Sequence, residues 1–476
     1  MKKIAIATLL LAATAHAEFD YHAASRQMIK NGVQAVLTCN GLFTSGRSAE
    51  LVAHEEREYL RVPRFGGDVT DNVIILDAVQ AVSVGGGEDG TAITAAFREG
   101  IGCVVMAPDQ TLADIGSLPE LRLPYPDFDP TTAPWPNGDV LADFAWPDAI
   151  DRDRLSAAAD LIMEPEAANH VSLSLIVVHK GQIVLERYRP GVDMLTKTRT
   201  WSTAKSIAAT LIGMLVDDGK LDLDKSLGLQ WLPSVAAAER DPRDAITLRH
   251  VLNMSSGLFP VDSFGMEYAS GSGLAYWAGL SSSIGARQRG LIREPGTFWD
   301  YENYDTLLAV AAMKEALGDD RTYLEFPRRR LLDRIGMRNT LLSTDRYGDF
   351  ILSSQVYTTA RDLARFGLLY LNGGVWDGDR LVAEEWIDFA RTPAPASAVR
   401  GNDYGGQFWL VPDDRNDVPK DAYATAGNRG QYVIIVPALD LVIVRRGLDF
   451  SSPHMQPWDI TATLLSAFPG WTPPRP

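Results

Sequence analysis

Ser202 and Lys205 form a Ser-x-x-Lys motif at the start of a segment with helical character. Residues three apart on a helix lie on one face, so the hydroxyl and the amine can meet. At a helix N-terminus the backbone N–H groups are unpaired and the helix dipole is positive, which favours a developing oxyanion. The motif therefore predicts a serine that takes part in acyl transfer. On its own it is equally compatible with Ser202 as a simple N-cap.

Tyr301 and Asn303 form the second candidate pair, on either side of Glu302. Alternate residues of an extended segment point to the same side, which predicts that the phenol and the amide face one site. A phenol beside an amine can relay protons, but both groups have an ordinary pKa near 10. Lowering either pKa to 7 needs a shift of roughly 3 units. Proximity favours the phenolate, whereas burial favours the neutral amine. Taken alone, Tyr301 also fits a half-buried aromatic residue, and we expect Asp300 and Glu302 to be solvated charges.

Gly427 and Asn428 mark the third candidate segment, which runs from Thr425 to Gln431 and leads into the β-rich stretch 432–437. Glycine lets the backbone approach a ligand closely. A free edge-strand N–H at this point is expected to supply an oxyanion donor. The alternative interpretation is a hairpin bulge that contains glycine.

Helices and strands at the two ends of the second half of the chain must bring these segments together. The predicted helices are 154–163, 202–216 and 461–467, and the predicted strands are 172–178, 182–187, 432–437 and 439–445. Lys180-Gly181 predicts a hairpin turn between the first two strands. Strands at both ends with helices between them predict an α+β fold, in which one antiparallel β-sheet is flanked by helices.

Further motifs accompany these three segments in a fixed order. They are 247–258, Pro295-Gly296-Thr297, Ile335-Gly336-Met337 with Thr340, and 359–367. Together the motifs resemble the serine β-lactamase and penicillin-binding-protein superfamily, and above all its class C-like branch with esterases and 6-aminohexanoate-dimer hydrolases. The resemblance covers about residues 150–470. It implies an α/β/α domain with an antiparallel sheet, an all-helical subdomain and, in this chain, an N-terminal extension.

The resemblance also implies a role for each candidate residue. Ser202 would be the acylated nucleophile and Lys205 its activator. Tyr301 would relay protons to the leaving group, and Asn303 would orient the substrate. The backbone N–H groups of Ser202 and Asn428 would form the oxyanion hole. Whether Lys205 or Tyr301 takes the first proton is open across the superfamily.

One departure from the superfamily concerns the third strand. Its β-lactamases and cell-wall peptidases carry Lys-Thr-Gly there, and the lysine helps to read a substrate carboxylate. Here Thr425-Ala426-Gly427 takes that place, and Arg429, two residues further on, is expected to face elsewhere. The departure favours an esterase or small-amide hydrolase over a β-lactamase or D,D-peptidase that acts on penicillin-like or peptidoglycan substrates. A non-catalytic binding protein on the same fold is the other alternative.

Length and charge set the wider frame. With 476 residues the chain exceeds one ordinary domain, and its formal net charge of −16 disfavours nucleic acid and anionic membranes as partners. Residues 1–17 have the basic start, apolar stretch and small-x-small end of a signal peptide, with cleavage predicted after Ala17. The other predicted parts are a lobe of unknown role at 18–117, a proline-rich connector at 118–147 and the hydrolase domain at 148–476.

Cys39 and Cys103 are the two cysteines of the chain. In an oxidising compartment such a pair can close a disulfide, and two buried thiols are the alternative. With no histidine at metal spacing, neither a metal nor an organic cofactor is predicted. The sequence thus predicts a periplasmic or secreted serine hydrolase, without a membrane anchor, that acts on a small-molecule ester or amide. It leaves the oligomeric state open.

Overall fold

The computed structural model describes residues 20–61, 69–165, 167, 169–234, 240–450 and 453–472. The predicted signal peptide, residues 1–17, lies outside the described residues. Within the described ranges, no helix combines the length and the apolar character that a membrane crossing requires.

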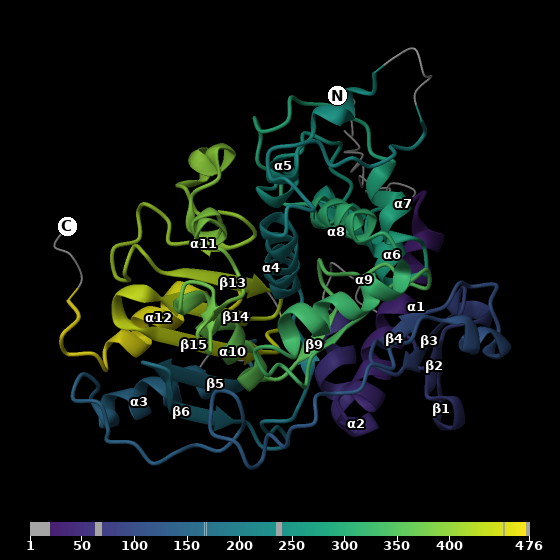
Figure 1. Cartoon of the computed structure of the whole chain (residues 1–476). Helices are drawn as coiled ribbons and strands as arrows, with labels where there is room; N and C mark the ends of the chain where they lie inside the picture. The colour runs from purple at the N-terminus through teal and green to yellow at the C-terminus, as the bar shows by residue number, and fades with distance from the viewer. Residues whose placement is uncertain are drawn as a thin grey trace, which may run out of the picture.

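A six-stranded antiparallel sheet forms the centre of the larger part of the molecule (Figure 1). Its strands, in spatial order, are β12 (Trp409–Leu410), β13 (Tyr423–Gly427), β14 (Gln431–Val436), β15 (Leu441–Gly447), β5 (Ser172–His179) and β6 (Gln182–Tyr188). Strands from distant parts of the sequence pair directly, with Val442 opposite Val178. The predicted sheet and its hairpin at Lys180-Gly181 are therefore confirmed.

Helices cover both faces of this sheet. The first pair is α4 (Thr203–Asp217) with α10 (Ala360–Leu371), and the second is α3 (Arg152–Met163) with α12 (Pro457–Leu465). Because successive strand residues point to opposite faces, Val433 and Ile435 join the core under the first pair, and Ile434 and Val436 join the core under the second. The predicted α/β/α order is confirmed. The last helix starts at Pro457, earlier than predicted, because proline suits a first helical turn.

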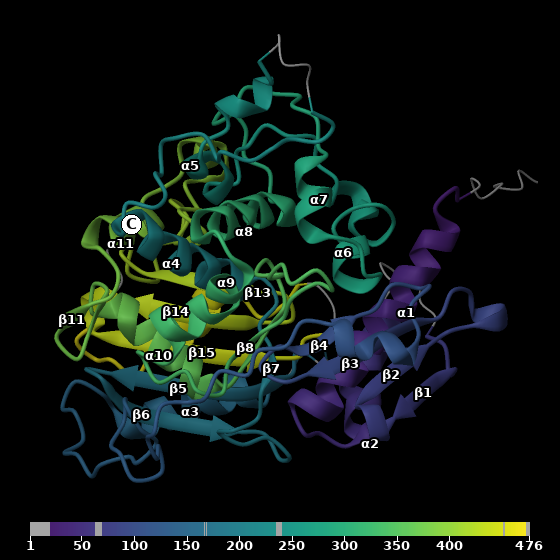
Figure 2. The same ribbon diagram turned by 45° about the vertical axis from the view of Figure 1, so that its right-hand side comes forward.

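A group of helices forms the all-helical subdomain beside the sheet (Figures 1 and 2). Its members are α5 (Leu248–Leu252), α6 (Gly273–Trp277), α7 (Ser282–Arg287), α8 (Asn303–Leu317) and α9 (Asp320–Pro327). Helix α8 is central, because it packs against α4, α5, α7 and α9. Gly318 ends it in the left-handed conformation, with φ 82°.

The N-terminal lobe lies beside the helical subdomain in both views (Figures 1 and 2). Its helical elements are α1 (Ala23–Cys39), α2 (Ala49–Val52) and three short π- or 3₁₀-helical segments, η1 (Asn40–Thr44), η2 (Ala53–Arg57) and η3 (Glu58–Arg61). Its antiparallel sheet consists of β1 (Val73–Leu76), β2 (Ala81–Val84), β3 (Ile93–Arg98) and β4 (Gly102–Val105). A disulfide joins Cys39 at the end of α1 to Cys103 in β4, as predicted.

Helix α1 joins the lobe to the rest of the molecule. It packs on β2, β3 and β4, and it also packs against α6. A Cβ at Gly32 would come within 1.6 Å of the Trp277 carbonyl oxygen, so only glycine allows this approach. One apolar core contains Val33 of the lobe, Tyr276 of α6 and Val178 of the central sheet. The lobe is therefore packed into the molecule and does not hang on a linker.

The proline-rich stretch 118–147 runs along the part of the molecule that contains the six-stranded sheet, and it contains none of the named helices or strands. Arg365 of α10 donates to the carbonyl oxygens of Pro136 and Gly138, both at 2.7 Å. Trp135 donates its indole N–H to the Gly181 carbonyl at 2.9 Å. The remaining strands and α-helix are β7 (Thr198–Arg199), β8 (Leu341–Leu342), β9 (Val356–Thr358), β10 (Val375–Trp376), β11 (Asp379–Arg380) and α11 (Glu384–Arg391).

Candidate active site

Ser202 directly precedes α4, which confirms the predicted helix. Lys205, one turn further on, places Nζ 3.2 Å from Ser202 Oγ. Trp201, just before the serine, has φ 51°, in the left-handed region. That conformation costs about 1–3 kcal/mol and persists only where packing enforces it. Part of this packing is the Arg199 guanidinium, whose carbon lies 3.9 Å from the centre of the Trp201 ring.

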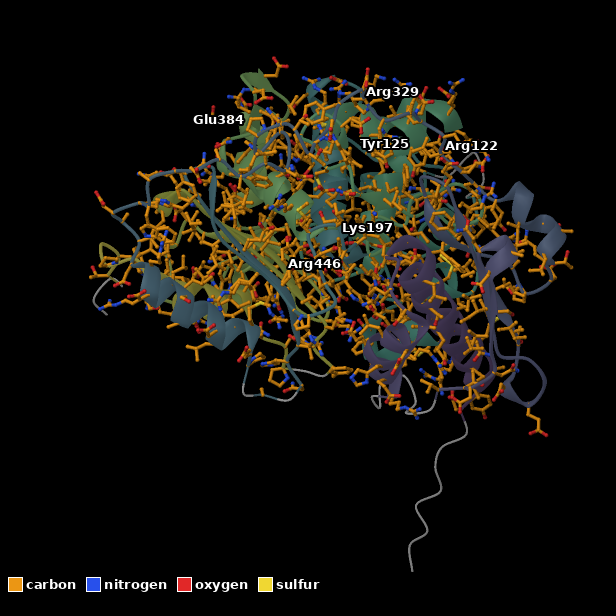
Figure 3. The ribbon with its side chains drawn as sticks, turned by 90° about the horizontal axis from the view of Figure 1, so that it is seen from below. Arg122, Tyr125, Lys197, Arg329, Glu384 and Arg446 are labelled. Atoms are coloured by element: carbon orange, nitrogen blue, oxygen red, sulfur yellow. A yellow bond between two sulfur atoms is a disulfide. The ribbon has the colours of Figure 1, made fainter. Side chains whose placement is uncertain are left out.

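Strand β7 leads the chain to Ser202, and Arg446 fixes that strand from the central sheet. The Arg446 side chain is buried (labelled in Figure 3) and donates to the carbonyl oxygens of Thr198 at 2.8 Å and Thr358 at 2.7 Å. Burial lowers the pKa of Arg446 to about 9, so it stays charged at neutral pH. The position of the serine therefore depends on contacts between β15, β7 and β9.

Lys205 is buried and makes three hydrogen bonds. Besides Ser202, its Nζ donates to Asn303 Oδ1 and to the Ser353 carbonyl oxygen, both at 2.7 Å. Its side chain is 1% exposed, and burial lowers its pKa to about 7 against the opposing charges of nearby carboxylates. A large share of Lys205 is thus a neutral amine at neutral pH, beside the serine hydroxyl.

Tyr301 lies over the same amine. The Lys205 Nζ is 4.9 Å from the centre of the Tyr301 ring, and the phenol is hydrogen-bonded with Ser202. Burial raises the pKa of Tyr301 despite that hydrogen bond. Of the two groups that the sequence left open, the structure lowers the pKa of the amine and not that of the phenol. Tyr301 is therefore a neutral phenol at neutral pH.

An aromatic cluster surrounds the Tyr301 ring. The ring centroids of Trp409, Trp299 and Tyr404 lie 5.7, 6.1 and 6.1 Å from that of Tyr301. Trp299 and Trp409 are half-buried, and Tyr404 is buried. The cluster explains why the phenol is desolvated, and it gives this side of the site an apolar surface.

Asn303 is the first residue of α8, and its side chain bridges Lys205 to an acidic cluster. Its Nδ2 donates to Asp262 Oδ2 at 2.9 Å, and the backbone N–H of Asp262 donates to Glu302 Oε1 at 3.3 Å. In this structure the amide of Asn303 holds Lys205 in place, and contact with a substrate stays a prediction. The charges of Asp262 and Glu267 act against the effect of burial and keep the pKa of Lys205 from falling further.

The prediction that Glu302 and Asp300 are solvated charges is wrong. Glu302 is 2% exposed, and burial together with the charge of Asp262 raises its pKa to about 9. Asp300 is half-buried, and burial raises its pKa as well. The turn before α8 folds into the helical subdomain, which buries the Glu302 carboxyl group and partly shields that of Asp300 from water. Glu302 is accordingly protonated at neutral pH.

The end of β13 lies against the start of α4, which brings the third predicted segment to Ser202. A Cβ at Gly427 would come within 2.1 Å of the Thr200 carbonyl oxygen, so glycine is required there. Thr203 Oγ1 and Thr425 Oγ1 are 3.1 Å apart, inside the protein. Asn428 follows β13 directly. Its backbone therefore lies near the serine, as the predicted oxyanion hole needs, although that role is a proposal.

Arg429 faces away from the serine, as expected. It is fully buried, and its guanidinium donates to Glu56 Oε2 at 2.8 Å and to the backbone carbonyls of Glu55 and Leu448 at 2.8 and 2.9 Å. Burial lowers its pKa to about 10. Glu56 and Glu55 belong to the N-terminal lobe, so the Arg429 guanidinium holds that lobe against the segment after β13.

Several residues around the site escaped the sequence reasoning. Ser353 acts through its carbonyl oxygen, which no residue type can signal. Asp262 lies in an irregular segment without a recognisable pattern. Tyr59 and His454, which bind the Asn428 side chain at 2.6 and 3.0 Å, come from the N-terminal lobe and from the stretch before α12. Their sequence distance from the serine conceals them.

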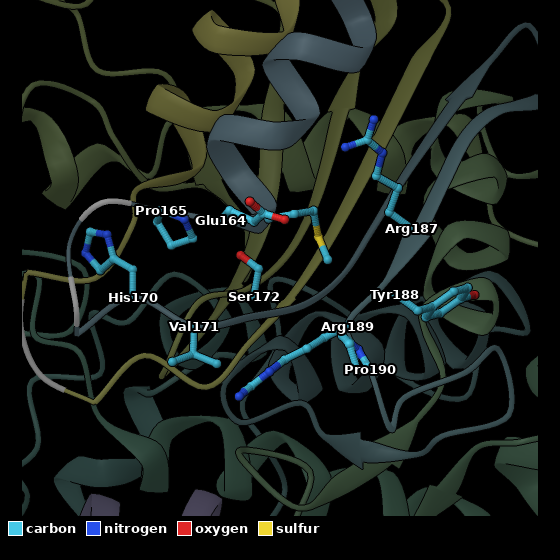
Figure 4. A pocket seen from close by; sticks show the side chains of 10 residues that line it. Glu164, Pro165, His170, Val171, Ser172, Arg187, Tyr188, Arg189 and Pro190 are labelled. Atoms are coloured by element: carbon cyan, nitrogen blue, oxygen red, sulfur yellow. The ribbon is translucent and has the colours of Figure 1, made fainter.

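A separate pocket of 530 Å³ opens between the end of α3 and strands β5 and β6 (Figure 4). Its lining does not include Ser202, Lys205 or Tyr301. Arg189, in its wall, donates to Glu55 Oε1 at 3.2 Å. The pocket therefore borders the buried charges of the N-terminal lobe and lies apart from the candidate active site.

This fold is that of the β-lactamase and transpeptidase class of serine hydrolases. The Beta-lactamase family matches residues 158–445, more than half of the chain, and the protein belongs to this family. A 6-aminohexanoate-dimer hydrolase from Paenarthrobacter ureafaciens is 23% identical over 309 residues, which are 60% of this chain and 74% of the relative.

Solved structures show the same fold. A proposed 6-aminohexanoate-dimer hydrolase from Bacillus anthracis is 21% identical with a TM-score of 0.51, over 65% of this chain and 83% of its own. A family VIII carboxylesterase is 15% identical with a TM-score of 0.50, over 69% of this chain and 98% of its own. At these identities the likeness concerns the fold alone. The N-terminal lobe lies outside the region that the family matches.

Proposed function

We propose that the protein is an exported serine hydrolase that cleaves a carboxylic ester or a small amide through an acyl-enzyme on Ser202. The observation that supports it most is the 3.2 Å contact between the Ser202 hydroxyl and the buried Lys205 amine, whose pKa is lowered to about 7. A neutral amine in hydrogen-bonding reach of a hydroxyl is the arrangement of a nucleophile with its general base.

In the proposed reaction, Ser202 Oγ attacks the carbonyl carbon while its proton passes to Lys205 Nζ. The backbone N–H groups of Ser202 and Asn428 stabilise the oxyanion of the tetrahedral intermediate. Tyr301 donates its phenolic proton to the leaving alcohol or amine and takes a proton from Lys205 in exchange. Water then attacks the acyl-enzyme, which releases the acid and restores Ser202.

The charges around the site favour an uncharged substrate over one with a carboxylate. Thr425 stands in place of the lysine, and the Arg429 guanidinium is bound to Glu56. Asp262 and Glu267 act on Lys205 through their negative charge and would repel a substrate carboxylate in the same way. The half-buried Trp299 and Trp409 suit an apolar acyl group. We expect esters to be better substrates than amides because esters acylate a serine more readily.

Export rests on two observations. The pattern of residues 1–17 is that of a signal peptide. A disulfide such as Cys39–Cys103 forms and persists in an oxidising compartment. We therefore place the mature protein in the periplasm or outside the cell.

A substrate panel tests the proposal. It comprises 4-nitrophenyl esters of increasing acyl length, short anilides and a chromogenic cephalosporin, each measured with the wild type and with Ser202→Ala. We expect ester turnover in the wild type alone, and labelling of Ser202 by a fluorophosphonate probe. Cephalosporin hydrolysis at a rate comparable to that of the esters would favour a β-lactamase. If the wild type showed no turnover and no labelling, a non-catalytic binding protein would be favoured.

A further inference from the structure

Tyr59 of the N-terminal lobe lies between the two backbone segments that flank the proposed oxyanion hole. Its side chain is 1% exposed, and its hydroxyl accepts a hydrogen bond from Asn428 Nδ2 at 2.6 Å. Its ring meets the Trp201 ring edge-on with centroids 6.1 Å apart. The Arg429 guanidinium carbon is 4.2 Å from the centre of the same ring.

Each of these contacts involves a residue that carries, or is next to a residue that carries, one of the two backbone N–H groups of the proposed oxyanion hole. Trp201 precedes Ser202, and Arg429 follows Asn428. Both Trp201 and Arg429 have positive φ, 51° and 62°. Such conformations are unfavourable for large residues and need external support. A single aromatic side chain from outside the family-matched region touches both of them.

Buried ion pairs fix the segment that carries Tyr59. Arg47 donates to Glu55 at 3.0 Å and to Glu56 at 2.7 Å. Glu56 also accepts from Arg429, at 2.8 Å. Burial alone would raise the pKa of Glu56, but Arg47 and Arg429 hold it below its ordinary value. The carboxylate stays ionised, so η2 and η3 remain fastened to the end of β13.

We infer that Tyr59 is a positioning residue for the oxyanion hole, and that the N-terminal lobe is thereby a working part of the active site. This inference rests on the proposed function. Through its hydroxyl, Tyr59 fixes the Asn428 side chain, and through its ring it supports the turn at Trp201. The two backbone N–H groups are thus kept at the separation that a single oxygen atom requires.

The expected effect falls on the transition state. Loss of one oxyanion donor costs about 10²–10³ in kcat, and a misaligned donor costs part of that, which sets the expectation at roughly tenfold. Because the oxyanion forms only during reaction, kcat falls while KM stays nearly constant. A purely structural role for Tyr59 would lower the unfolding midpoint and leave kcat of the folded enzyme unchanged.

The test uses full-length mature protein with Tyr59→Phe, Asn428→Ala and the double variant. Each single variant removes one partner of the same hydrogen bond and leaves the backbone N–H in place. We expect each to lower kcat for 4-nitrophenyl acetate by roughly tenfold, and the double variant to be no slower than Asn428→Ala alone, which also loses the hydrogen bond with His454. Losses that multiply, or a Tyr59→Phe enzyme with wild-type kcat, would overturn the inference.

Tyr323→Phe is the matched control. Tyr323 is a fully buried tyrosine on α9 whose hydroxyl also accepts one amide N–H, from Phe350 at 2.9 Å. It should lose stability to a similar extent and keep wild-type kcat. An equal loss of kcat in this control would show that Tyr59 acts only through stability and would refute a specific role.

Fluorophosphonate labelling gives a second readout. In this reaction a bond forms between Ser202 Oγ and phosphorus, the hydroxyl proton passes to Lys205 Nζ, fluoride leaves, and the phosphoryl oxygen enters the proposed oxyanion hole. The labelling rate should fall in parallel with kcat, and an unchanged rate would argue against the inference. If Tyr59→Phe does not fold, Asn428→Ala decides by the same two measurements. A wild type that shows neither turnover nor labelling would instead refute the proposed function.

Discussion

Lys205 and Arg429 are both buried basic side chains, the first beside Ser202 and the second next to Asn428, but their surroundings differ. The hydrogen-bond acceptors of Lys205 Nζ are the neutral oxygens of Ser202, Asn303 and Ser353. Carboxylates stand nearby and act on the amine only through their field. Its pKa is therefore lowered to about 7, and it can exchange a proton near neutral pH.

Arg429, in contrast, meets the Glu56 carboxylate directly at 2.8 Å. Its pKa is lowered by burial only to about 10, so it remains a fixed charge. The comparison shows how one protein treats two cations in two ways. Lys205, which must titrate, is buried among neutral acceptors, and Arg429, which holds two segments together, is buried against a counter-ion.

Lys205→Met should give the largest effect on activity. Without the proposed base, ester turnover should fall by about a thousandfold. The free energy of unfolding should change by less than about 2 kcal/mol, because removal of a buried amine offsets its lost hydrogen bonds. Tyr301→Phe should cost a similar factor, and the double variant should be little worse, since the two groups act as one unit. Turnover that survives in Lys205→Met would end the assignment.

Arg429→Met should show the opposite pattern. It removes one partner of a buried ion pair, so the free energy of unfolding should fall by about 3–5 kcal/mol in urea titrations. Glu56→Gln should behave likewise. Arg391→Met, which breaks an exposed pair with Asp388, is the control and should cost less than about 1 kcal/mol. Equal losses in the two arginine variants would show that the buried pair has no special weight.

Reduction of the Cys39–Cys103 disulfide should come next in size. The bond ties α1 to β4 within the lobe that carries Glu56. Its loss should lower the free energy of unfolding by about 2–4 kcal/mol. Differential scanning calorimetry with and without a reductant measures this, and Cys39→Ala/Cys103→Ala serves as the control that a reductant cannot affect. An unchanged midpoint would mean that the thiols are not bridged in the purified protein.

The pH profile tests Lys205 more finely. A base whose pKa is lowered to about 7 is protonated and inactive below that pH. Ester kcat/KM should therefore fall about tenfold per pH unit below 7 and level off above it. Stopped-flow or steady-state rates between pH 5 and pH 9 give the curve. An inflection near 10 instead would mean that the amine keeps its ordinary pKa.

Glu302→Gln should have the smallest effect on activity at neutral pH. The pKa of Glu302 is raised from 4.5 to about 9, so folding takes up a proton between these values and stability falls as pH rises through that range. The glutamine variant lacks this loss. Its stability advantage should grow by about 1 kcal/mol per pH unit between pH 5 and pH 9 in chemical denaturation. It should keep the activity inflection near 7, because Glu302 is already neutral there, and a moved inflection would contradict this.

Local patterns predicted the parts of the fold that depend on neighbours in sequence. The helix after Ser202, the hairpin at Lys180-Gly181 and the paired strands near the C-terminus follow from periodicity and turn residues. Those patterns do not report burial, which is why Glu302 was misjudged. Nor do they report the partners of Asn428, because Tyr59 and His454 come from opposite ends of the chain.

The sequence by itself determined which groups are present and which of them share a helix or a turn. Spacing alone sets Lys205 one turn from Ser202, and composition alone supplies the paired cysteines. Only the tertiary structure decided the charge of those groups and the contact between the N-terminal lobe and the residues beside Ser202 and Asn428. The physical reason is that desolvation and counter-ions depend on every segment packed around an atom, and those segments meet only when the whole chain has folded.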